Sequence, residues 1–463
     1  MSETQLAEAW GEPDALPDSR QLEAYFDHGR QKFWIQNSRG GWIEVGEKAI
    51  ARVLIAADYL NQRQGPEPMS EVQQQILRLQ TQHDVAYAGP LAGYSCGVTE
   101  ICGNRILVTS SPRIISAAEG PCDTVLALLE NLFVDQLPYV LGWLKVADEA
   151  LRVGHRRPGQ ALALAGPRNS GKSLFQNLLT LILGGRAAKP YRYMSGATAF
   201  NGELLGAEHL MIEDEFASTD IRSRRHFGAR IKEVTVNEVQ SCHSKNRQAI
   251  SMIPFWRLSI SLNEEPENLL ILPPFDESLA DKIMLLKVRK QPMPMRTNSC
   301  EERAAFWKTL QSELPAFLHF LSRWDLPEGL RCGRFGVQTY HHPELLSAID
   351  SMSPQLRLLE LIDAYYWPGC RERSVGGVVA HTPGEPSAAV RITASELEGV
   401  LAGAGGSHEA RRLLDWPNAT GTYLGRLAKT HPTRVTEDRT ASTRYWVITA
   451  PPESLQGPDK TPK

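Results

Sequence analysis

Eight residues from Gly166 to Ser173, GPRNSGKS, have the spacing of a phosphate-binding loop, GxxxxGK[ST]. The apolar run QALALA before them is typical of a buried strand, and SLFQNLLTLILGG after them has the periodicity of an amphipathic helix. Glycines let such a loop curl until its N–H groups and the helix N-terminus face phosphate oxygens. Because strand and helix are both present, we favour a nucleotide-binding loop over a chance match. The expected phosphate-binding residues are Gly166, Pro167, Arg168, Asn169, Ser170, Gly171, Lys172 and Ser173.

Three carboxylates form a second cluster, Glu213, Asp214 and Glu215, at the end of the apolar stretch HLMI. With ATP as the nucleotide, Lys172 is expected to reach the outer phosphates and Ser173 to bind Mg²⁺. One carboxylate would complete the Mg²⁺ shell and its neighbour would polarise the attacking water. The working pair is Glu213 with Asp214 or Asp214 with Glu215, so the candidate metal ligands are Ser173, Glu213 and Asp214. A solvated strand end is the alternative.

A single amide, Asn263, follows a further apolar strand, FWRLSISL. An amide offers both a donor and an acceptor without charge, so Asn263 is suited to orient the lytic water or to sense the γ-phosphate. Asparagine after a strand is more often a turn former. The two motifs upstream favour the catalytic interpretation.

The composition is that of a globular protein rather than a disordered or fibrous one. Of 463 residues, 42% are hydrophobic and 22% are charged, and the formal net charge is −3, so any polyanion must bind to a local patch. The polar, acidic N-terminal segment lacks the pattern of a signal peptide, and polar residues interrupt the apolar stretch 125–144. We therefore expect a cytoplasmic protein, in a bacterium or in the host of a phage. Seven cysteines without zinc spacing are expected to be buried free thiols.

The elements that must position these residues fall into four predicted regions. An α/β nucleotide-binding core is expected where short apolar strands alternate with amphipathic helices. Before it, strand patterns at 32–45 and 104–110 mix with helical patterns at 49–60, 69–82 and 123–152. The regions are 1–150, a mixed α/β collar or oligomerisation region; 151–290, the ATPase core; 291–370, a helical linker region; and 371–463, a small C-terminal domain.

The order of these motifs resembles that of the superfamily 3 helicases. A phosphate-binding loop, an acidic strand, a basic helix with a hairpin, and a strand ending in asparagine all lie between Gly166 and Asn263. The resemblance is to the branch found in phages, plasmids and poxvirus-type primase-helicases. It implies an AAA+ P-loop ATPase core that binds ATP and Mg²⁺ and assembles into a ring, typically a hexamer.

In that family, a β-hairpin before the strand-asparagine carries a lysine that grips the DNA backbone. Lys245 in VNEVQSCHSKNRQAISM stands at the matching place, and His243 and Arg247 flank it. Some viral members have histidine after the lysine, where this chain has Asn246. Contacts of this kind are driven by charge and do not depend on sequence. A solvated basic loop is the alternative.

The family also implies a cation that reaches the nucleotide of the neighbouring subunit. Arg230 matches a position of this kind, and the usual arginine finger is replaced by Lys282 in LADKIMLLKV. Such a charge stabilises the transition state. Lysine lacks the planar fork of arginine, so the substitution is not neutral. Either Arg230 or another arginine would then serve.

The C-terminal residues have the pattern of a winged-helix domain. ITASELEGVLA gives a first helix, NATGTYLGRLAKTHP a candidate recognition helix, and TRVTEDRTASTRYWVITAP a two-stranded wing. Arg426, Lys429 and Arg444 are the candidate DNA contacts, with Arg434 and Arg439 as further basic residues of the same segment. Winged helices also bind proteins, which is the alternative.

The N-terminal region shows no primase site, because it lacks a convincing pair of metal-binding acids between strands. Trp34 and Trp42 could stack on bases, but aromatic residues in a strand pair are more often core residues. The function expected from the resemblance is an ATP-dependent DNA helicase that unwinds single-stranded or forked DNA in replication. A separate primase or initiator is the further partner to consider. The alternatives are an ATPase that remodels a protein, and a DNA-binding initiator with weak ATPase activity.

Overall fold

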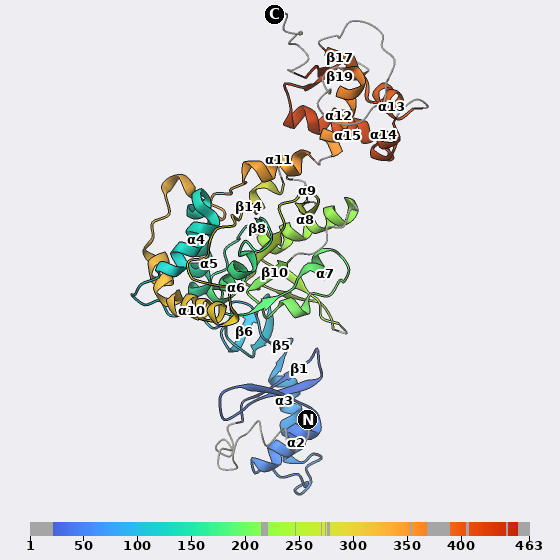
Figure 1. The fold of residues 1–463 in the computed structure, drawn as a ribbon. Coiled ribbons are helices and arrows are strands. Elements are labelled where there is room, and N and C mark those ends of the chain that lie inside the picture. The colour runs from blue at the N-terminus through green and yellow to red at the C-terminus, as the bar shows by residue number, and fades with distance from the viewer. Residues whose placement is uncertain are drawn as a thin grey trace, which may run out of the picture. The chain divides into compact units, whose positions relative to one another are not determined.

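A computed structural model describes most of the chain in two compact units, Met1–Leu345 and Leu346–Lys463 (Figure 1). The described residues are 22–213, 221–245, 247–269, 271–273, 275, 278–351, 354–367, 389–403, 407–440 and 443–451. The division between the units falls inside helix α11 (Pro343–Ser351).

The first unit begins with a four-stranded sheet covered on one face by two helices. Its strand order is β3-β2-β1-β4, with β1 antiparallel to β2 and parallel to β4. The apolar stripes of the helices, which include Ile50 and Leu54 of α2, pack on alternate residues of the strands, which include Phe33 and Ile35 of β2. The elements are β1 (Ala24–Asp27), β2 (Lys32–Gln36), β3 (Trp42–Val45), α2 (Glu47–Ala56), α3 (Glu71–Gln82) and β4 (Asp84–Val85).

A second small sheet, of order β5-β7-β6, follows directly. Its strands are β5 (Tyr87–Gly89), β6 (Gly97–Ile101) and β7 (Asn104–Val108). Trp34 and Trp42 from the first sheet are partly buried and pack against a small cluster that includes Val85 and Leu107. These tryptophans therefore serve as packing residues, as expected for aromatic residues in a strand pair, rather than as platforms for stacking on bases.

Two apolar helices lead into the central sheet. They are α4 (Asp123–Phe133) and α5 (Leu137–Val153), separated by the short 3₁₀ helix η2 (Val134–Gln136). Among the described residues, Asp123–Val153 is the one helical stretch long and apolar enough to cross a membrane, and half of its most apolar window is buried inside the protein. Both helices pack on the long helix α10 (Cys300–Arg323), as core helices do.

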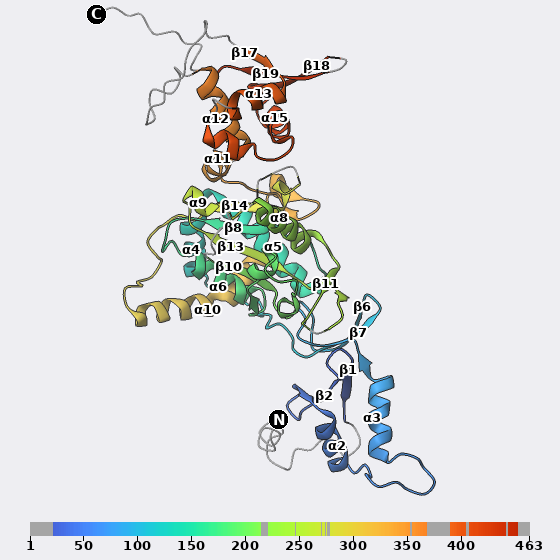
Figure 2. The same ribbon diagram turned by 90° about the vertical axis from the view of Figure 1, so that its right-hand side faces the viewer.

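The central sheet is parallel throughout, with strand order β14-β8-β13-β10-β9 (Figure 2). All five residues of β8 are buried, which explains its uninterrupted run ALALA. Helices α6 (Lys172–Ile182) and α8 (Ile221–Val236) both pack on β13. The strands are β8 (Ala161–Ala165), β9 (Ala187–Ala188), β10 (His209–Glu213), β13 (Arg257–Leu262) and β14 (Ile283–Lys287). The predicted α/β architecture of this core is confirmed.

Shorter elements complete the first unit. A two-stranded hairpin, β11 (Gln240–Cys242) and β12 (Ile250–Met252), lies between α8 and β13 in the chain, as predicted. A second hairpin consists of β15 (Arg331–Cys332) and β16 (Gly336–Val337). The short helices are α7 (Tyr191–Met194), η3 (Gly202–Leu204), α9 (Pro266–Leu269), η4 (Ala280–Lys282) and η5 (Glu328–Leu330).

The second unit combines helices with an antiparallel sheet of order β17-β19-β18. Its core contains Leu397, Leu424 and Trp446, each almost completely buried. Helix α15 and the β18–β19 hairpin lie where the sequence predicted a helix and a two-stranded wing. The elements are α12 (Pro354–Tyr366), β17 (Ala389–Ile392), α13 (Ala394–Ala402), α14 (His408–Leu413), α15 (Ala419–Thr430), β18 (Val435–Arg439) and β19 (Arg444–Thr449).

The cysteines depart from expectation. Of those in the described residues, Cys122 and Cys242 are buried, whereas Cys96, Cys102 and Cys300 are exposed. The prediction that the thiols are generally buried is therefore wrong, because these three lie in turns or at a helix start rather than on an apolar face.

Candidate functional site

The strand order brings three predicted motifs to one edge of the central sheet. Strands β8, β13 and β10 are adjacent and parallel, so their carboxyl ends lie side by side. The loop 166–173 leaves β8, Asn263 follows β13, and Glu213 ends β10. The carboxyl edge of an open parallel sheet is where ligands of this fold class bind.

The loop has the backbone that a phosphate-binding loop requires. Asn169 and Gly171 have φ values of 59° and 98°, in the left-handed region, and Gly171 is the N-cap of α6. A Cβ atom at Gly166 would lie 2.3 Å from the carbonyl oxygen of Val288, so no side chain fits there. The first turn of α6 supplies N–H groups that have no partner within the helix. This curled loop can surround an anion.

Lys172 points back into the loop. Its Nζ atom donates hydrogen bonds to the carbonyl oxygens of Gly166 (2.8 Å) and Pro167 (2.9 Å) and lies 3.5 Å from Oδ1 of Asn263. The residue is buried, with 6% of its surface exposed. The loop lysine and the strand-terminal amide, 91 positions apart, therefore share one site.

A cavity of about 550 Å³ opens at this place. Cavities of this size hold small-molecule ligands. The chemistry of the lining suits a nucleoside triphosphate, because it combines a loop of backbone N–H groups with a buried ammonium and a neutral amide. The lining residues are Arg168, Asn169, Ser170, Gly171, Lys172, Ser173, Leu174, Leu262, Asn263 and Asn268.

The acidic strand end is described only in part. Glu213 is about one-third exposed and forms an ion pair with Lys189, which follows β9. Asp214 and Glu215 lie outside the described residues. Among the residues that are described, no group of three or more His, Cys, Asp or Glu side chains is placed to hold a metal. Mg²⁺ needs no such cluster, since one or two carboxylates and the substrate phosphates usually suffice.

A buried polar network underlies the loop, and sequence reasoning missed it. His209 of β10 contacts the Thr180 hydroxyl through Nδ1 and the Ser259 hydroxyl through Nε2, each at 2.7 Å. Gln176 of α6 donates to the same Ser259 hydroxyl (2.8 Å) and to the Ile212 carbonyl (3.2 Å). Complete burial lowers the pKa of His209 to about 3, so the imidazole is neutral. The sequence signal that could have predicted this network is the pair of polar residues Gln176 and Thr180, four positions apart on the sheet-facing side of α6.

The two candidates for a cation acting on a neighbouring subunit are both engaged within their own chain. Arg230 donates to the Tyr193 hydroxyl (2.7 Å), pairs with Glu233, and lies 4.4 Å above the Tyr193 ring. Lys282 is buried and pairs with Asp281. Arg334 lies 2.9 Å from the same Asp281 carboxylate, and its side chain is 47% exposed. A role in trans would require Arg230 or Lys282 to leave these partners.

The basic hairpin residues differ in how they are held. Lys245 is exposed at the turn between β11 and β12. His243 is half-buried, with its ring 4.9 Å from that of Phe200. The Arg247 side chain is mostly buried, with 11% of its surface exposed, and forms a 3.5 Å ion pair with Asp27, which is completely buried in β1.

In the second unit, Arg426, Lys429 and Arg444 line one cavity of about 750 Å³ over α15 and the β18–β19 hairpin. Arg444 pairs with Glu437 at 2.6 Å and lies 4.8 Å above the Trp446 ring. Arg434, in contrast, pairs with Asp363 (2.6 Å) and donates to the Thr449 carbonyl. It therefore holds α12 against the sheet.

Comparison with known proteins gives one family match and several structural likenesses. Residues 164–277, less than half of the chain, match DUF5906, a family of unknown function. This segment contains the loop, the acidic strand, the hairpin and Asn263. No curated protein matches the sequence.

Two solved structures of the NrS-1 C-terminal region share the fold. An apo structure has a TM-score of 0.52 and 14% identity, over 95% of this chain and all of that one. The A form has a TM-score of 0.51 and 13% identity, over 94% of this chain and 97% of that one. A structure described as the active helicase of SCCmec type IV Cch is more distant, with a TM-score of 0.41 and 10% identity over 93% of each chain. At identities of 13% and 14%, the likeness to the NrS-1 C-terminal region shows a shared fold alone.

Proposed function

We propose that this protein is an ATP-driven DNA helicase of the superfamily 3 type. The observation that carries the proposal is the site shared by Lys172 and Asn263, which follow the neighbouring parallel strands β8 and β13, with Glu213 at the end of the next strand, β10. The family match over 164–277 and the fold shared with the NrS-1 C-terminal region are compatible with it. We further propose an AAA+ core, a C-terminal winged helix and a hexameric ring.

ATP would lie on the loop 166–173, with Lys172 balancing the charge of the outer phosphates. Ser173 and a carboxylate, Glu213 or Asp214, would hold Mg²⁺, which supplies charge neutralisation between the phosphates when bound. Asn263 is 3.5 Å from Nζ of Lys172, where its amide can orient the attacking water. Glu213 would exchange its Lys189 partner for the metal, which costs little because an exposed ion pair is weak.

DNA would be gripped by the exposed Lys245 of the hairpin, with His243 beside it. The Arg426, Lys429 and Arg444 cavity would bind a second stretch of DNA. Both groups of residues make charge-driven contacts, which a translocating motor requires because it must pass over any sequence.

ATP hydrolysis measured with and without single-stranded DNA tests the proposal. The wild type should hydrolyse ATP, and DNA should stimulate it. Lys172→Ala should hydrolyse ATP at least about 100-fold more slowly, because it removes the buried ammonium that would stabilise the negative charge developing on the phosphates. Lys245→Ala should keep basal hydrolysis and lose the stimulation, whereas Lys308→Ala, an exposed lysine of α10, should keep both. Hydrolysis by Lys172→Ala at the wild-type rate would refute the assigned site. Hydrolysis that DNA never stimulates would favour an ATPase that remodels a protein.

A further inference from the structure

A basic groove lies between the N-terminal sheet and the tip of the β11–β12 hairpin. It has a volume of about 740 Å³ and is lined by residues from four places along the chain, one of which is the 198–203 stretch after α7. Gly29 and Arg30 come from the β1–β2 turn, Arg192 from α7, and Lys245 and Arg247 from the hairpin. Four cations therefore face one cavity, and Glu203 is the one acidic residue of its lining. A groove of this charge suits a polyanion.

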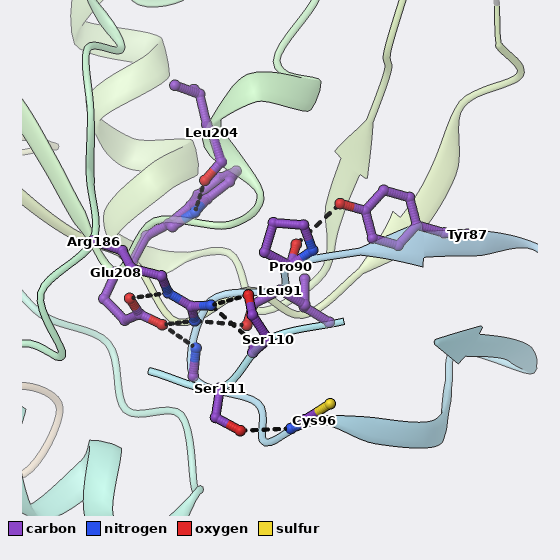
Figure 3. Close-up of polar contacts among 11 residues, drawn as sticks. Tyr87, Pro90, Leu91, Cys96, Ser110, Ser111, Arg186, Leu204 and Glu208 are labelled. Carbon is purple, nitrogen blue, oxygen red and sulfur yellow. Dashed lines mark hydrogen bonds and ion pairs between the residues drawn. The ribbon is translucent and has the colours of Figure 1, made fainter. Parts of the chain in front are cut away.

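The N-terminal region is fixed to the core by a buried ion pair (Figure 3). Arg186 binds Glu208, whose carboxylate is completely buried, with Nε to Oε2 at 3.0 Å. The same guanidinium donates to the carbonyl oxygens of Ser110 (3.0 Å) and Leu91 (3.1 Å), and Glu208 accepts from the Gly93 N–H (2.8 Å). The segments before β6 and after β7 are thus bound to the residues that immediately precede β9 and β10 of the central sheet. The β1–β2 turn, which supplies one wall of the groove, belongs to this attached N-terminal region.

The hairpin contacts that turn directly. The Arg247 side chain lies 3.6 Å from where a Cβ atom of Gly29 would stand, and its guanidinium pairs with Asp27. Neither Nη2 of Arg247 nor Oδ2 of Asp27 makes a hydrogen bond within the described residues. Attraction between the two charges therefore holds Arg247 against the β1–β2 turn, and its mostly buried side chain adds positive charge to the groove wall.

Arg30 is the cation that the N-terminal region adds to the groove. Its side chain is 49% exposed and pairs with Glu44, which is one-third exposed. Its backbone N–H donates to Oδ1 of Asp27 (3.1 Å), which fixes the turn. A solvent-exposed ion pair contributes little stability, so a phosphate can replace Glu44 as the partner of Arg30.

We propose that Arg30 binds the phosphodiester backbone of single-stranded DNA, across the groove from Lys245. The inference rests on the proposed function and adds the N-terminal region to its DNA path. A strand in the groove would lie between the β1–β2 turn and the hairpin tip, so hairpin movement would be transmitted to DNA that the N-terminal region also holds.

The test is the salt dependence of binding to a fluorescent oligothymidine, followed by anisotropy in the full-length protein. One lost phosphate contact lowers the slope of log K against log salt by about 0.7, or about fivefold in affinity at 0.1 M salt. Arg30→Ala should show that change, with ATP hydrolysis in the absence of DNA unaltered. Arg30→Lys should restore most of the slope because it keeps the charge. Arg39→Ala, which removes an exposed arginine from the β2–β3 turn, is the matched control and should bind as the wild type does.

The result separates this inference from the proposed function. If Lys245→Ala weakens binding and Arg30→Ala leaves both affinity and slope unchanged, the role of Arg30 is refuted and the motor proposal stands. If neither variant binds more weakly and DNA does not stimulate hydrolysis, the motor proposal fails as well. A loss in Arg30→Ala that Arg30→Lys does not restore, with an unchanged slope, would assign Arg30 a structural role through Glu44.

Discussion

At the scale of single residues, the backbone of the Gly166–Ser173 loop is the feature that the sequence predicts best. Its motif is local: eight consecutive residues specify the curled backbone, and the flanking apolar runs specify the strand and helix. The contact of Lys172 with Asn263 joins residues 91 positions apart. It could be predicted because the loop that carries Lys172 and the residue Asn263 follow two buried strands, β8 and β13, whose carboxyl ends meet at one edge of a parallel sheet. In a parallel sheet, residues that are far apart in the sequence come close together when they follow adjacent strands.

The pairing of Arg247 with Asp27 was not predictable in the same way. Asp27 ends a short strand in which three of the four residues are buried, and no periodicity links it to a hairpin about 220 positions later. The sequence marked Arg247 as a free DNA contact, whereas the structure pairs it with a buried carboxylate. Burial raises the pKa of Asp27, with backbone hydrogen bonds opposing the shift. Long-range ion pairs of this kind have no local signature.

Gly166 supplies a prediction at this scale. Substituting alanine would place Cβ 2.3 Å from the Val288 carbonyl oxygen, a backbone atom that cannot swing aside. Gly166→Ala should destabilise the protein by about 1–3 kcal/mol, as overpacking does, and weaken nucleotide binding by moving the loop. Thermal unfolding and nucleotide titration measure the two effects. Gly329→Ala, where a Cβ atom would meet nothing within 4 Å, is the control. Equal stability of both variants would contradict the packing argument.

At the scale of elements, the His209 network connects α6 with β10 and β13. The pKa of His209, about 3, makes the free energy of unfolding depend on pH in one predictable direction. The unfolded chain takes up a proton near pH 6.5 that the folded chain refuses until about pH 3, so the free energy of unfolding decreases as pH falls between these values. The decrease is at most about 1.4 kcal/mol per pH unit from this one group.

His209→Gln should remove that dependence while keeping a hydrogen-bonding side chain. The variant is expected to be less stable than the wild type at pH 7.5, and the difference should narrow toward pH 4.5. Denaturant unfolding at several pH values measures it. Parallel stability curves for the two proteins would mean that His209 does not titrate on unfolding.

The Arg186–Glu208 pair gives a second prediction at the element scale. Removing one member of a buried ion pair leaves the other charge uncompensated, which costs about 3–5 kcal/mol. Arg186→Met should therefore destabilise the first unit and expose the 109–122 segment to protease, because Ser110 and Leu91 lose their donor. The control is Arg113→Met, which removes an exposed arginine of that segment. Unchanged protease sensitivity in Arg186→Met would show that the pair does not attach the N-terminal region.

Element positions were largely predictable from periodicity. The strands at 32–36, 42–45 and 104–108, and the helices α3, α4 and α15, lie within the segments expected from sequence, and α2 and α5 extend beyond theirs by two residues and one residue. The pairing of strands was less accessible. The N-terminal residues form two small sheets. Strand β1 pairs in parallel with β4, although two helices separate these strands along the chain, and no local pattern specifies such a pairing.

At the scale of the whole molecule, a formal net charge of −3 means that the proposed DNA binding depends on local patches, for which the basic groove and the Arg426 cavity are the candidates. A ring is needed if Arg230 or Lys282 is to act on a neighbouring nucleotide. We expect the wild type to assemble into hexamers with ATP and single-stranded DNA, and Lys172→Ala to assemble less. Mass photometry measures the distribution. A protein that stays monomeric under all these conditions would exclude a trans-acting cation.

Strand displacement on a forked duplex tests the central proposal most directly. With ATP and Mg²⁺, the wild type should release the labelled strand, Lys245→Ala should release it much more slowly, and Lys172→Ala should release none. Release without ATP, or equal release by wild type and Lys172→Ala, would contradict a motor driven from the Gly166–Ser173 loop. ATP hydrolysis by the wild type without any release of the strand would contradict helicase activity itself.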